Sequence, residues 1–227
     1  MLRLIEKEQD LRDGLDALLA VDLRLARVLG VAGLPPLRRR PGGFAGLASI
    51  IVSQQLSTAS AAAIWGRLSA AFDPLEPDAV RRARTAKLQR VGLSAPKIRT
   101  LKAIAKAVES GAIDFDALGA MSADDAHRML TAVHGIGPWT ADIYLLVCLG
   151  HADAWPAGDL ALQEAIRLAF ALDARPTVKD MVSLAEPWRP WRGVAARLLW
   201  AYYRAAKGRD AAPIQPTLRE DDNGRRA

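Results

Sequence analysis

Apolar residues recur three and four positions apart along almost the whole chain, and strand-like alternation of apolar and polar residues is nearly absent. This spacing gathers the apolar side chains on one face of a helix, so it predicts an all-α protein. Glycine and proline residues interrupt the pattern at intervals, where they disfavour continuation of a helix. The predicted helices cover residues 6–29, 43–72, 77–90, 96–109, 123–132, 138–149, 159–171, 177–185 and 190–206.

The pattern divides the chain into three parts. An N-terminal helix and linker, residues 1–42, precede a core of residues 43–207, and the polar segment from 208 to 227 has the composition of a mobile tail. Within the core we expect two helical lobes, roughly residues 43–120 and 121–207, with the active-site cleft between them. The N-terminal helix is expected to join the second lobe.

Composition narrows the class of protein. With 227 residues, 51% hydrophobic and 25% charged, the chain resembles a globular protein that can bury a core without disulfides or metals. No apolar run approaches the roughly 18 residues of a membrane helix, and acids interrupt the first apolar residues. We therefore expect no membrane partner and a cytoplasmic protein, associated with the nucleoid in a bacterium or located in the nucleus of a eukaryote. One cysteine, Cys148, allows neither an internal disulfide nor a four-thiolate iron-sulfur cluster.

The net charge of +6 is distributed unevenly. Residues 81–106 carry nine cations without an acid, residues 189–209 carry six more, and the stretch 110–186 between them is net minus 7. Such segments are either solvated helix faces that happen to be basic or phosphate-binding segments on both sides of an active site. The second interpretation predicts a polyanionic partner.

Two helical patterns meet at Gly135-Ile136-Gly137, within the stretch LTAVHGIGPWTADIYLLVCL. So tight a reversal needs residues that accept positive φ and allow close approach of two backbones. Pro138 then fits the first position of the second helix, where its missing N–H costs nothing. The turn presents unpaired N–H groups, which suit a phosphate oxygen or a cation that bridges to one.

A carboxylate follows in the sequence WPAGDLAL. Asp159 is predicted to be the N-cap of a helix, directly after a Pro-Ala-Gly turn. Either it is an ordinary capping residue, or it is a carboxylate fixed at a helix start close to the hairpin.

Four segments of the chain, in the order in which they occur, resemble those of a known family. GIGPWTAD and PAGDLAL, with IIVSQQLSTASAAAIW upstream and PWRPWRGVAARLLWAYY downstream, resemble the helix-hairpin-helix DNA glycosylase superfamily and, within it, the 3-methyladenine DNA glycosylase II family. By this resemblance Asp159 is the catalytic carboxylate, and His134, Gly135, Ile136 and Gly137 belong to the hairpin that grips DNA phosphate. Only about forty residues precede the core, so the resemblance implies a short form without the N-terminal β-sheet domain of the long form.

The resemblance also implies a substrate pocket. Relatives that cleave the DNA backbone carry a lysine where this chain has Trp139, because an amine can form a Schiff base with the sugar. An indole lacks that chemistry, so a monofunctional enzyme that uses water is expected. Trp139 either stacks on the flipped base or packs in the core. Trp200 and Leu160 are further candidate pocket residues, as is Ile143, which stands where the long form has a second aromatic residue.

Base flipping requires a residue that fills the vacated position in the base stack. Residues 53–57 match the segment from which relatives insert such a plug, with Gln55 as the first candidate and Leu56 as the second. The alternative is a helix that carries two solvated glutamines. The turn at residues 92–97 resembles a degenerate hairpin and predicts Lys97 at a helix start, near the opposite DNA strand.

The function implied is excision of alkylated purines, of the 3-methyladenine and 7-methylguanine type, from double-stranded DNA in base excision repair. We expect a monomer and neither a metal nor a redox cofactor, although the hairpin is suited to a monovalent cation that bridges to phosphate. Two alternatives stay open: a non-catalytic DNA-binding module, and a glycosylase for uracil or mismatched thymine on the same fold.

Overall fold

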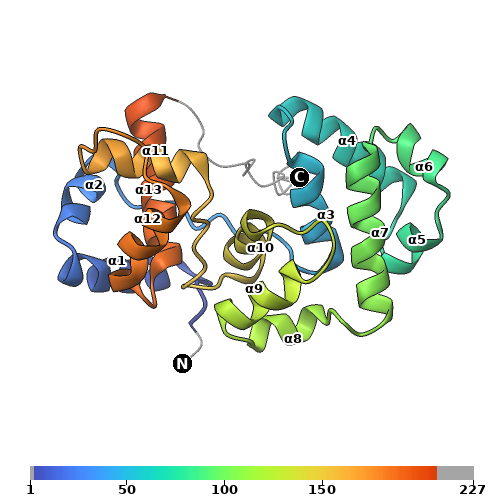
Figure 1. The fold of residues 1–227 in the computed structure, drawn as a ribbon, viewed down its shortest axis with the longest axis horizontal. Helices are drawn as coiled ribbons and strands as arrows, with labels where there is room; N and C mark the ends of the chain where they lie inside the picture. Colours follow the sequence, from blue (N-terminus) through green and yellow to red (C-terminus); the bar gives the residue numbers. More distant parts are fainter. Residues whose placement is uncertain (1–2, 209–227) are drawn as a thin grey trace, which may run out of the picture.

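The computed structural model describes residues 3–208, which form α-helices joined by loops (Figure 1). The all-α prediction is confirmed: within this range the extended pairing is a single bridge between Leu4 and His151. None of the described helices is long and apolar enough to cross a membrane. The predicted tail lies outside the described residues, apart from its first residue, Gly208. The helices are α1 Glu8–Val21, α2 Arg24–Ala32, α3 Gly43–Ser53, α4 Thr58–Ala71, α5 Pro77–Arg82, α6 Thr85–Arg90, α7 Ala95–Glu109, α8 Phe115–Ala120, α9 Ala123–Thr131, α10 Pro138–Tyr144, α11 Leu160–Ala169, α12 Val178–Ala185 and α13 Arg192–Lys207, with a π-helix, η1 Leu145–Leu149, and a 3-10 turn, η2 Glu186–Trp188.

Three of the predicted helices are each two helices in the structure. α1 and α2 are separated at Asp22, whose carboxylate accepts a hydrogen bond from the Arg24 backbone N–H at 3.1 Å. α3 and α4 are separated by a short loop, and Ser57 caps α4 by accepting from the N–H of Ser60. α5 ends at Ala83, whose extended backbone separates it from α6. Side-chain hydrogen bonds thus mark the breaks at Asp22 and Ser57, which apolar spacing alone does not show, whereas the break at Ala83 is a change of backbone conformation only.

The short helix α8 was not predicted. Its N-cap, Asp114, accepts hydrogen bonds from the backbone N–H groups of Asp116 and Ala117 at 2.9 and 3.2 Å. The capping signal is present in the sequence, but six residues are too few to show a helical period.

The helices form two groups (Figure 1). α1 and α2 pack with α11 and α13 in one group, and the other contains α3 to α10. The packing differs from the expected division near residue 120, because α10 packs against α3 and α9. Tyr144 at the end of α10 accepts a hydrogen bond from the N–H of Gly43 at the start of α3, at 2.9 Å. α9 and α10 are thereby fixed to the group that carries α3.

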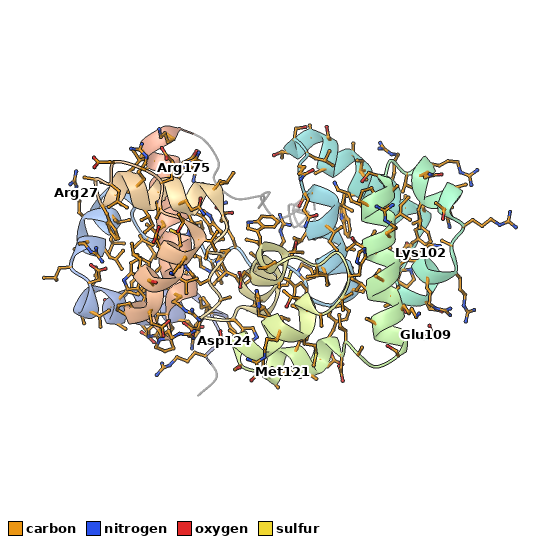
Figure 2. All side chains as sticks on the ribbon, in the orientation of Figure 1. Arg27, Lys102, Glu109, Met121, Asp124 and Arg175 are labelled. Atoms are coloured by element: carbon orange, nitrogen blue, oxygen red, sulfur yellow. The ribbon has the colours of Figure 1, made fainter. Side chains whose placement is uncertain are left out.

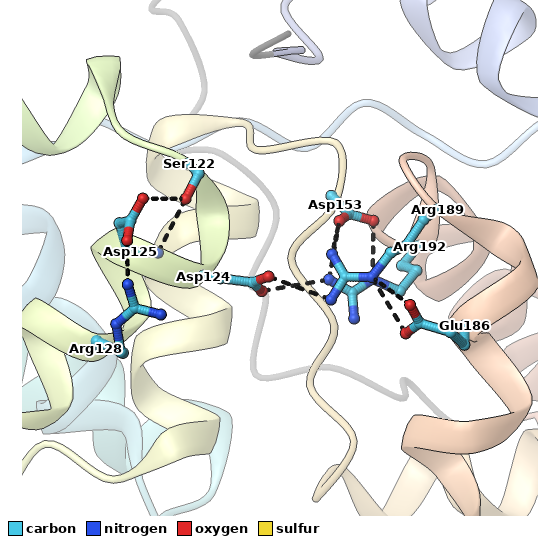
Figure 3. A network of polar contacts seen from close by, with 8 residues as sticks. All are labelled: Ser122, Asp124, Asp125, Arg128, Asp153, Glu186, Arg189 and Arg192. Atoms are coloured by element: carbon cyan, nitrogen blue, oxygen red, sulfur yellow. Dashed lines mark hydrogen bonds and ion pairs between the residues drawn. The ribbon is translucent and has the colours of Figure 1, made fainter.

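An ion-pair network joins the two groups (Figure 3). Asp124, on α9 at the border between the groups in Figure 2, lies 3.2 Å from Arg189 and 3.5 Å from Arg192. Asp153, in the loop after the π-helix, binds the same two guanidinium groups, at 2.5 Å from Arg189 and 2.8 Å from Arg192. The Arg192 side chain is only 7% exposed, so this network replaces water around a nearly buried charge.

The loop between the π-helix and α11 carries the chain from one group to the other. Gly150 ends the π-helix in the left-handed conformation with φ +77, where a Cβ would collide with Arg39. The carbonyl of Ala152 accepts a hydrogen bond from the N–H of Gly193 on α13 at 2.6 Å. This fixed loop ends at Asp159, which begins the site.

Candidate active site

Asp159 is the N-cap of α11, as predicted. Its Oδ1 accepts hydrogen bonds from the backbone N–H groups of Ala161 and Leu162, both at 3.0 Å. The residue is only 6% exposed. The cap holds the carboxylate at the positive end of the helix dipole, where a negative charge is favoured.

Two tryptophan side chains also donate to this carboxylate. The Nε1–H of Trp139, on α10 directly after the hairpin, donates to Oδ2 at 2.8 Å. The Nε1–H of Trp200, on α13, donates to Oδ1 at 3.2 Å. Three helices from both groups thus converge on one carboxyl group.

The four donors are shared unequally between the two carboxylate oxygens. Oδ1 accepts three N–H groups, whereas Oδ2 accepts one, from Trp139. Every partner is a donor, which suits an ionised carboxylate, since a carboxylate only accepts hydrogen bonds. Oδ2 keeps the larger acceptor capacity, so it is the atom best able to orient a water or to face a developing positive charge.

The other predicted pocket residues have different positions. Leu160 directly follows Asp159 and is 66% exposed, while Trp139 is half-buried beside the carboxylate. Ile143 is 2% exposed and belongs to the hydrophobic core. The structure does not bring the Ile143 side chain to an accessible surface, because α10 turns this position toward the packed interior.

The predicted hairpin turn lies between α9 and α10. Gly135 has φ +89, and a Cβ there would collide with the side chain of Thr100 on α7. Ile136 is 4% exposed and packs into the core, and its backbone N–H donates to the carbonyl of Val133 at 3.1 Å. His134 and Gly137 are exposed. Pro138 occupies the first position of α10, as predicted.

The predicted plug segment forms the loop between α3 and α4. Gln55 is exposed and has φ +57, a left-handed conformation that costs a residue with a Cβ free energy. Leu56 is 38% exposed. Gln54 is directed the other way: its Nε2 donates to Oγ1 of Thr140 on α10 at 2.7 Å. The loop that carries both plug candidates is therefore bonded to the helix that carries Trp139.

Lys97 lies at the start of α7, as predicted, but its ammonium is directed inward. Nζ donates to the backbone carbonyls of Val52 and Gln54 at 2.7 and 2.8 Å. Burial lowers the pKa of Lys97 from its ordinary value. This geometry does not support the expectation of a phosphate contact, because the ammonium is used at the end of α3.

Two more lysines of the basic segment are used in the same way. Lys87 donates to the last carbonyl of α4 at 2.9 Å, and Lys102, labelled in Figure 2, donates to the carbonyl that ends α5 at 2.7 Å. Cations at helix C-termini satisfy carbonyls that have no partner within the helix. Arg90 and Arg99 differ: both are exposed, and their guanidinium groups have no hydrogen bond or ion pair within residues 3–208. Part of the basic pattern is thus structural, and part stays open to a polyanion.

Sequence reasoning missed a buried carboxyl group one helical turn after Trp139. Burial raises the pKa of Asp142 to about 8, opposed by the charge of Arg192 and increased by that of Asp124. Nε2 of His127 lies 3.7 Å from Oδ1 of Asp142, and burial lowers the pKa of this histidine. No feature of the sequence marks Asp142, because an acid on an amphipathic helix is ordinarily solvated.

Comparison with known protein families gives a match over more than half of the chain. Residues 48–190 match the HhH-GPD superfamily of base excision DNA repair proteins. The chain therefore belongs to this superfamily.

Two similar proteins are named DNA-3-methyladenine glycosylases. A DNA-3-methyladenine glycosylase of Bacillus subtilis is 27% identical over 197 residues, which are 82% of this chain and 63% of the relative. DNA-3-methyladenine glycosylase 1 of Schizosaccharomyces pombe is 32% identical over 170 residues, 73% of this chain and 74% of the relative. The chain thus spans less than two thirds of the length of the first relative.

Solved structures share the fold. A Schizosaccharomyces pombe 3-methyladenine DNA glycosylase in complex with abasic DNA has a TM-score of 0.73 and 27% identity, over 85% of this chain and 95% of that one. A DNA-3-methyladenine glycosidase from Bacillus halodurans has a TM-score of 0.76 and 31% identity, over 86% and 90% of the two chains.

Proposed function

We propose that the protein is a monofunctional DNA glycosylase of the 3-methyladenine DNA glycosylase II type, which removes alkylated purines from double-stranded DNA. The observation that carries this proposal is the Asp159 carboxylate, held by the α11 cap and by the indoles of Trp139 and Trp200. Membership of a base excision repair superfamily and the names of the relatives support the substrate class.

The chemistry follows from what must be stabilised. The bond between C1′ and the base nitrogen breaks with its electron pair on the purine, and positive charge develops on the sugar. An ionised carboxylate beside that charge lowers the barrier, and it can accept the proton of the water that adds to C1′. A purine alkylated at a ring nitrogen is already cationic and leaves as a neutral base. It needs little help from a general acid, so one carboxylate suffices.

The absence of lyase chemistry is part of the proposal. Trp139 occupies the position where lyase relatives carry an amine, and its indole N–H is directed to Asp159. An indole nitrogen has no available lone pair with which to attack C1′, so water is the nucleophile and the DNA strand stays intact. No step of this route needs a metal, and we propose that a monomer acts alone.

DNA recognition rests on the exposed hairpin and on the plug loop. The exposed hairpin residues His134, Gly135 and Gly137 can bind phosphate oxygens through their backbone groups, directly or through a monovalent cation. The flipped nucleotide leaves a gap that Gln55 or Leu56 fills from the exposed loop. The similar Schizosaccharomyces pombe glycosylase is bound to abasic DNA, the product of this reaction, which supports the assignment.

The experiment is a release assay on duplexes that contain 3-methyladenine or 7-methylguanine, with uracil and mismatched thymine duplexes beside them. We expect free methylated purine and a strand that breaks only after hot alkali. Breakage without alkali, or trapping of the protein on DNA by borohydride, would contradict the monofunctional mechanism. Release of uracil or thymine without release of methylated purines would contradict the substrate class.

A further inference from the structure

The ammonium of Lys97 binds the end of α3 at the point where the plug loop begins. Nζ donates to the carbonyls of Val52, in the last turn of α3, and of Gln54, its C-cap, where carbonyls have no partner within the helix. A cation there satisfies two acceptors and the negative end of the helix dipole together. The position of Gln54, and so the start of the plug loop, depends on Lys97.

A second bond holds the same loop from the opposite side. The Gln54 side chain donates to Oγ1 of Thr140, a residue that is 3% exposed and adjoins Trp139 on α10. Gln55, the next residue, is held in a left-handed conformation that is unfavourable in an unconstrained chain. The hydrogen bonds from Lys97 and to Thr140 both involve Gln54, so together they fix how far Gln55 and Leu56 project from the surface.

The same face of α7 also supports the hairpin. Thr100 lies one helical turn after Lys97, and positions three apart lie on the same face of a helix. The Thr100 side chain is so close to Gly135 that no Cβ would fit there. The first two turns of α7 thus contact both the plug loop and the turn of the hairpin.

We propose that Lys97 is a positioning residue that fixes the plug loop, Gln54 to Leu56, relative to the hairpin. The hairpin can then bind phosphate while the plug loop fills the gap left by the extruded base on the same DNA. The inference rests on the proposed glycosylase function. It replaces a direct contact between Lys97 and DNA with an indirect role. A plug matters most when the lesion is paired and stacked, because extrusion then costs a few kcal/mol. Loss of Lys97 should therefore affect paired lesions more than unpaired ones.

The test compares single-turnover release from a base-paired lesion with release of the same lesion opposite a one-nucleotide gap. Lys97→Met keeps the aliphatic stem and removes the ammonium. It should lower the rate on the paired lesion about tenfold more than on the unpaired one, the effect of losing a hydrogen bond to a charged group. Lys97→Arg keeps a charged donor and should recover most of this selectivity.

Lys102→Met is the matched control. Lys102 is another α7 lysine that binds a helix-terminal carbonyl, but on α5, away from the plug loop. The Lys102→Met variant should lose thermal stability but keep the wild-type ratio of the release rates on the paired and the unpaired lesion. Thr140→Val removes the hydrogen bond to the Gln54 side chain without removing a charge. It should shift the ratio of the two rates in the same direction as Lys97→Met. The inference therefore stays testable if Lys97→Met does not fold.

The outcomes separate the two proposals. A wild-type protein that releases neither lesion overturns the glycosylase function and this inference with it. An active wild type, with ratios in Lys97→Met and Thr140→Val that equal those of Lys102→Met, overturns the positioning role alone. An unchanged ratio together with a flatter salt dependence of DNA binding in Lys97→Met would instead restore Lys97 as a phosphate contact.

Discussion

The indole N–H of Trp139 donates to Oδ2 of Asp159 at 2.8 Å, across 20 positions of the chain. Trp139 is the second residue of α10, and Asp159 is the N-cap of α11 in the other group of helices. The orientation of the carboxylate therefore depends on the helix that follows the hairpin. One side chain connects the proposed phosphate-binding hairpin with the proposed catalytic carboxylate.

Trp139→Phe tests this connection. Phenylalanine keeps an aromatic ring but removes the donor to Oδ2, so the carboxylate is less firmly oriented. We expect the rate of purine release to fall about tenfold, as for loss of a hydrogen bond to a charged group, with little change in affinity for abasic DNA. Trp188→Phe is a matched control, since the Trp188 indole donates to the carboxylate of Asp22 at 3.0 Å, away from the site. An equal loss of activity in both variants would indicate general destabilisation.

The exposed arginines near the turn at residues 92–97 should account for part of the salt dependence. Arg90 and Arg99 are exposed, whereas Lys102 is used inside the fold. Each arginine that contacts a phosphate contributes about 0.9 to the slope of log K against log salt, so Arg90→Ala and Arg99→Ala should each flatten the slope by about that amount. Lys102→Met should leave it unchanged. Slopes that stay at the wild-type value in both arginine variants would place this surface outside the DNA interface.

Asp142 should make stability depend on pH in an unusual direction. Its pKa is about 8 in the folded protein and 3.8 in an unfolded chain, so the folded state holds a proton that the unfolded state releases. The free energy of unfolding should therefore fall as the pH rises between these values, and this contribution is lost above the folded pKa. Asp142→Asn removes the titration.

The melting temperature of Asp142→Asn relative to wild type should rise with pH over this window. His127, whose pKa is lowered from 6.5, acts in the opposite sense at lower pH, so measurements above about pH 7 isolate Asp142. A difference in melting temperature that is constant from about pH 7 to about pH 9 would contradict a protonated Asp142.

The ion-pair network between the two groups should stabilise the fold through its buried member. Asp153→Ala removes the nearest carboxylate from Arg192, which is 7% exposed. We expect a loss of about 2 to 3 kcal/mol in the free energy of unfolding, less than for a fully buried pair because Asp124 remains 3.5 Å away. Glu186→Ala removes a 60% exposed partner of Arg189 and should cost less than about 0.5 kcal/mol. Urea unfolding of both variants checks this, and equal losses would contradict it.

Much of the site follows from local signals in the sequence. The Pro-Ala-Gly-Asp turn predicted the cap at Asp159, and the hairpin glycines predicted the tight turn that Gly135 makes against α7. Both depend on backbone conformation within a few residues, which composition and spacing determine directly. The all-α class likewise follows from the spacing of apolar residues.

The remaining features depend on contacts that are remote in the sequence. Lys97 meets the end of α3 from 43 and 45 positions away, and Gln54 meets Thr140 from 86 positions away. Spacing in the sequence shows a basic segment, but not which cations the fold uses at its own helix ends. The burial of Ile143, a predicted pocket residue, could not be seen from the sequence for the same reason, because helix packing decides which side of α10 is buried.

Replacement of Asp159 by asparagine tests the central claim most directly, and the geometry makes its design specific. Oδ1 of asparagine can still accept the N–H groups of Ala161 and Leu162, but its amide nitrogen would face the N–H of Trp139. Two donors then oppose each other, which lowers stability for reasons unrelated to charge. The variant is therefore made both in the wild type and in Trp139→Phe, where this opposition is absent.

The measurement is the single-turnover rate of 7-methylguanine release by folded Asp159→Asn, compared in each background with its Asp159 parent. We predict a fall of at least about 100-fold in both backgrounds, the typical effect of removing electrostatic stabilisation from a transition state. Binding to uncharged abasic DNA should stay within a few-fold, since the hairpin is intact. Release at the parental rate in the Trp139→Phe background would contradict a catalytic role for the Asp159 carboxylate.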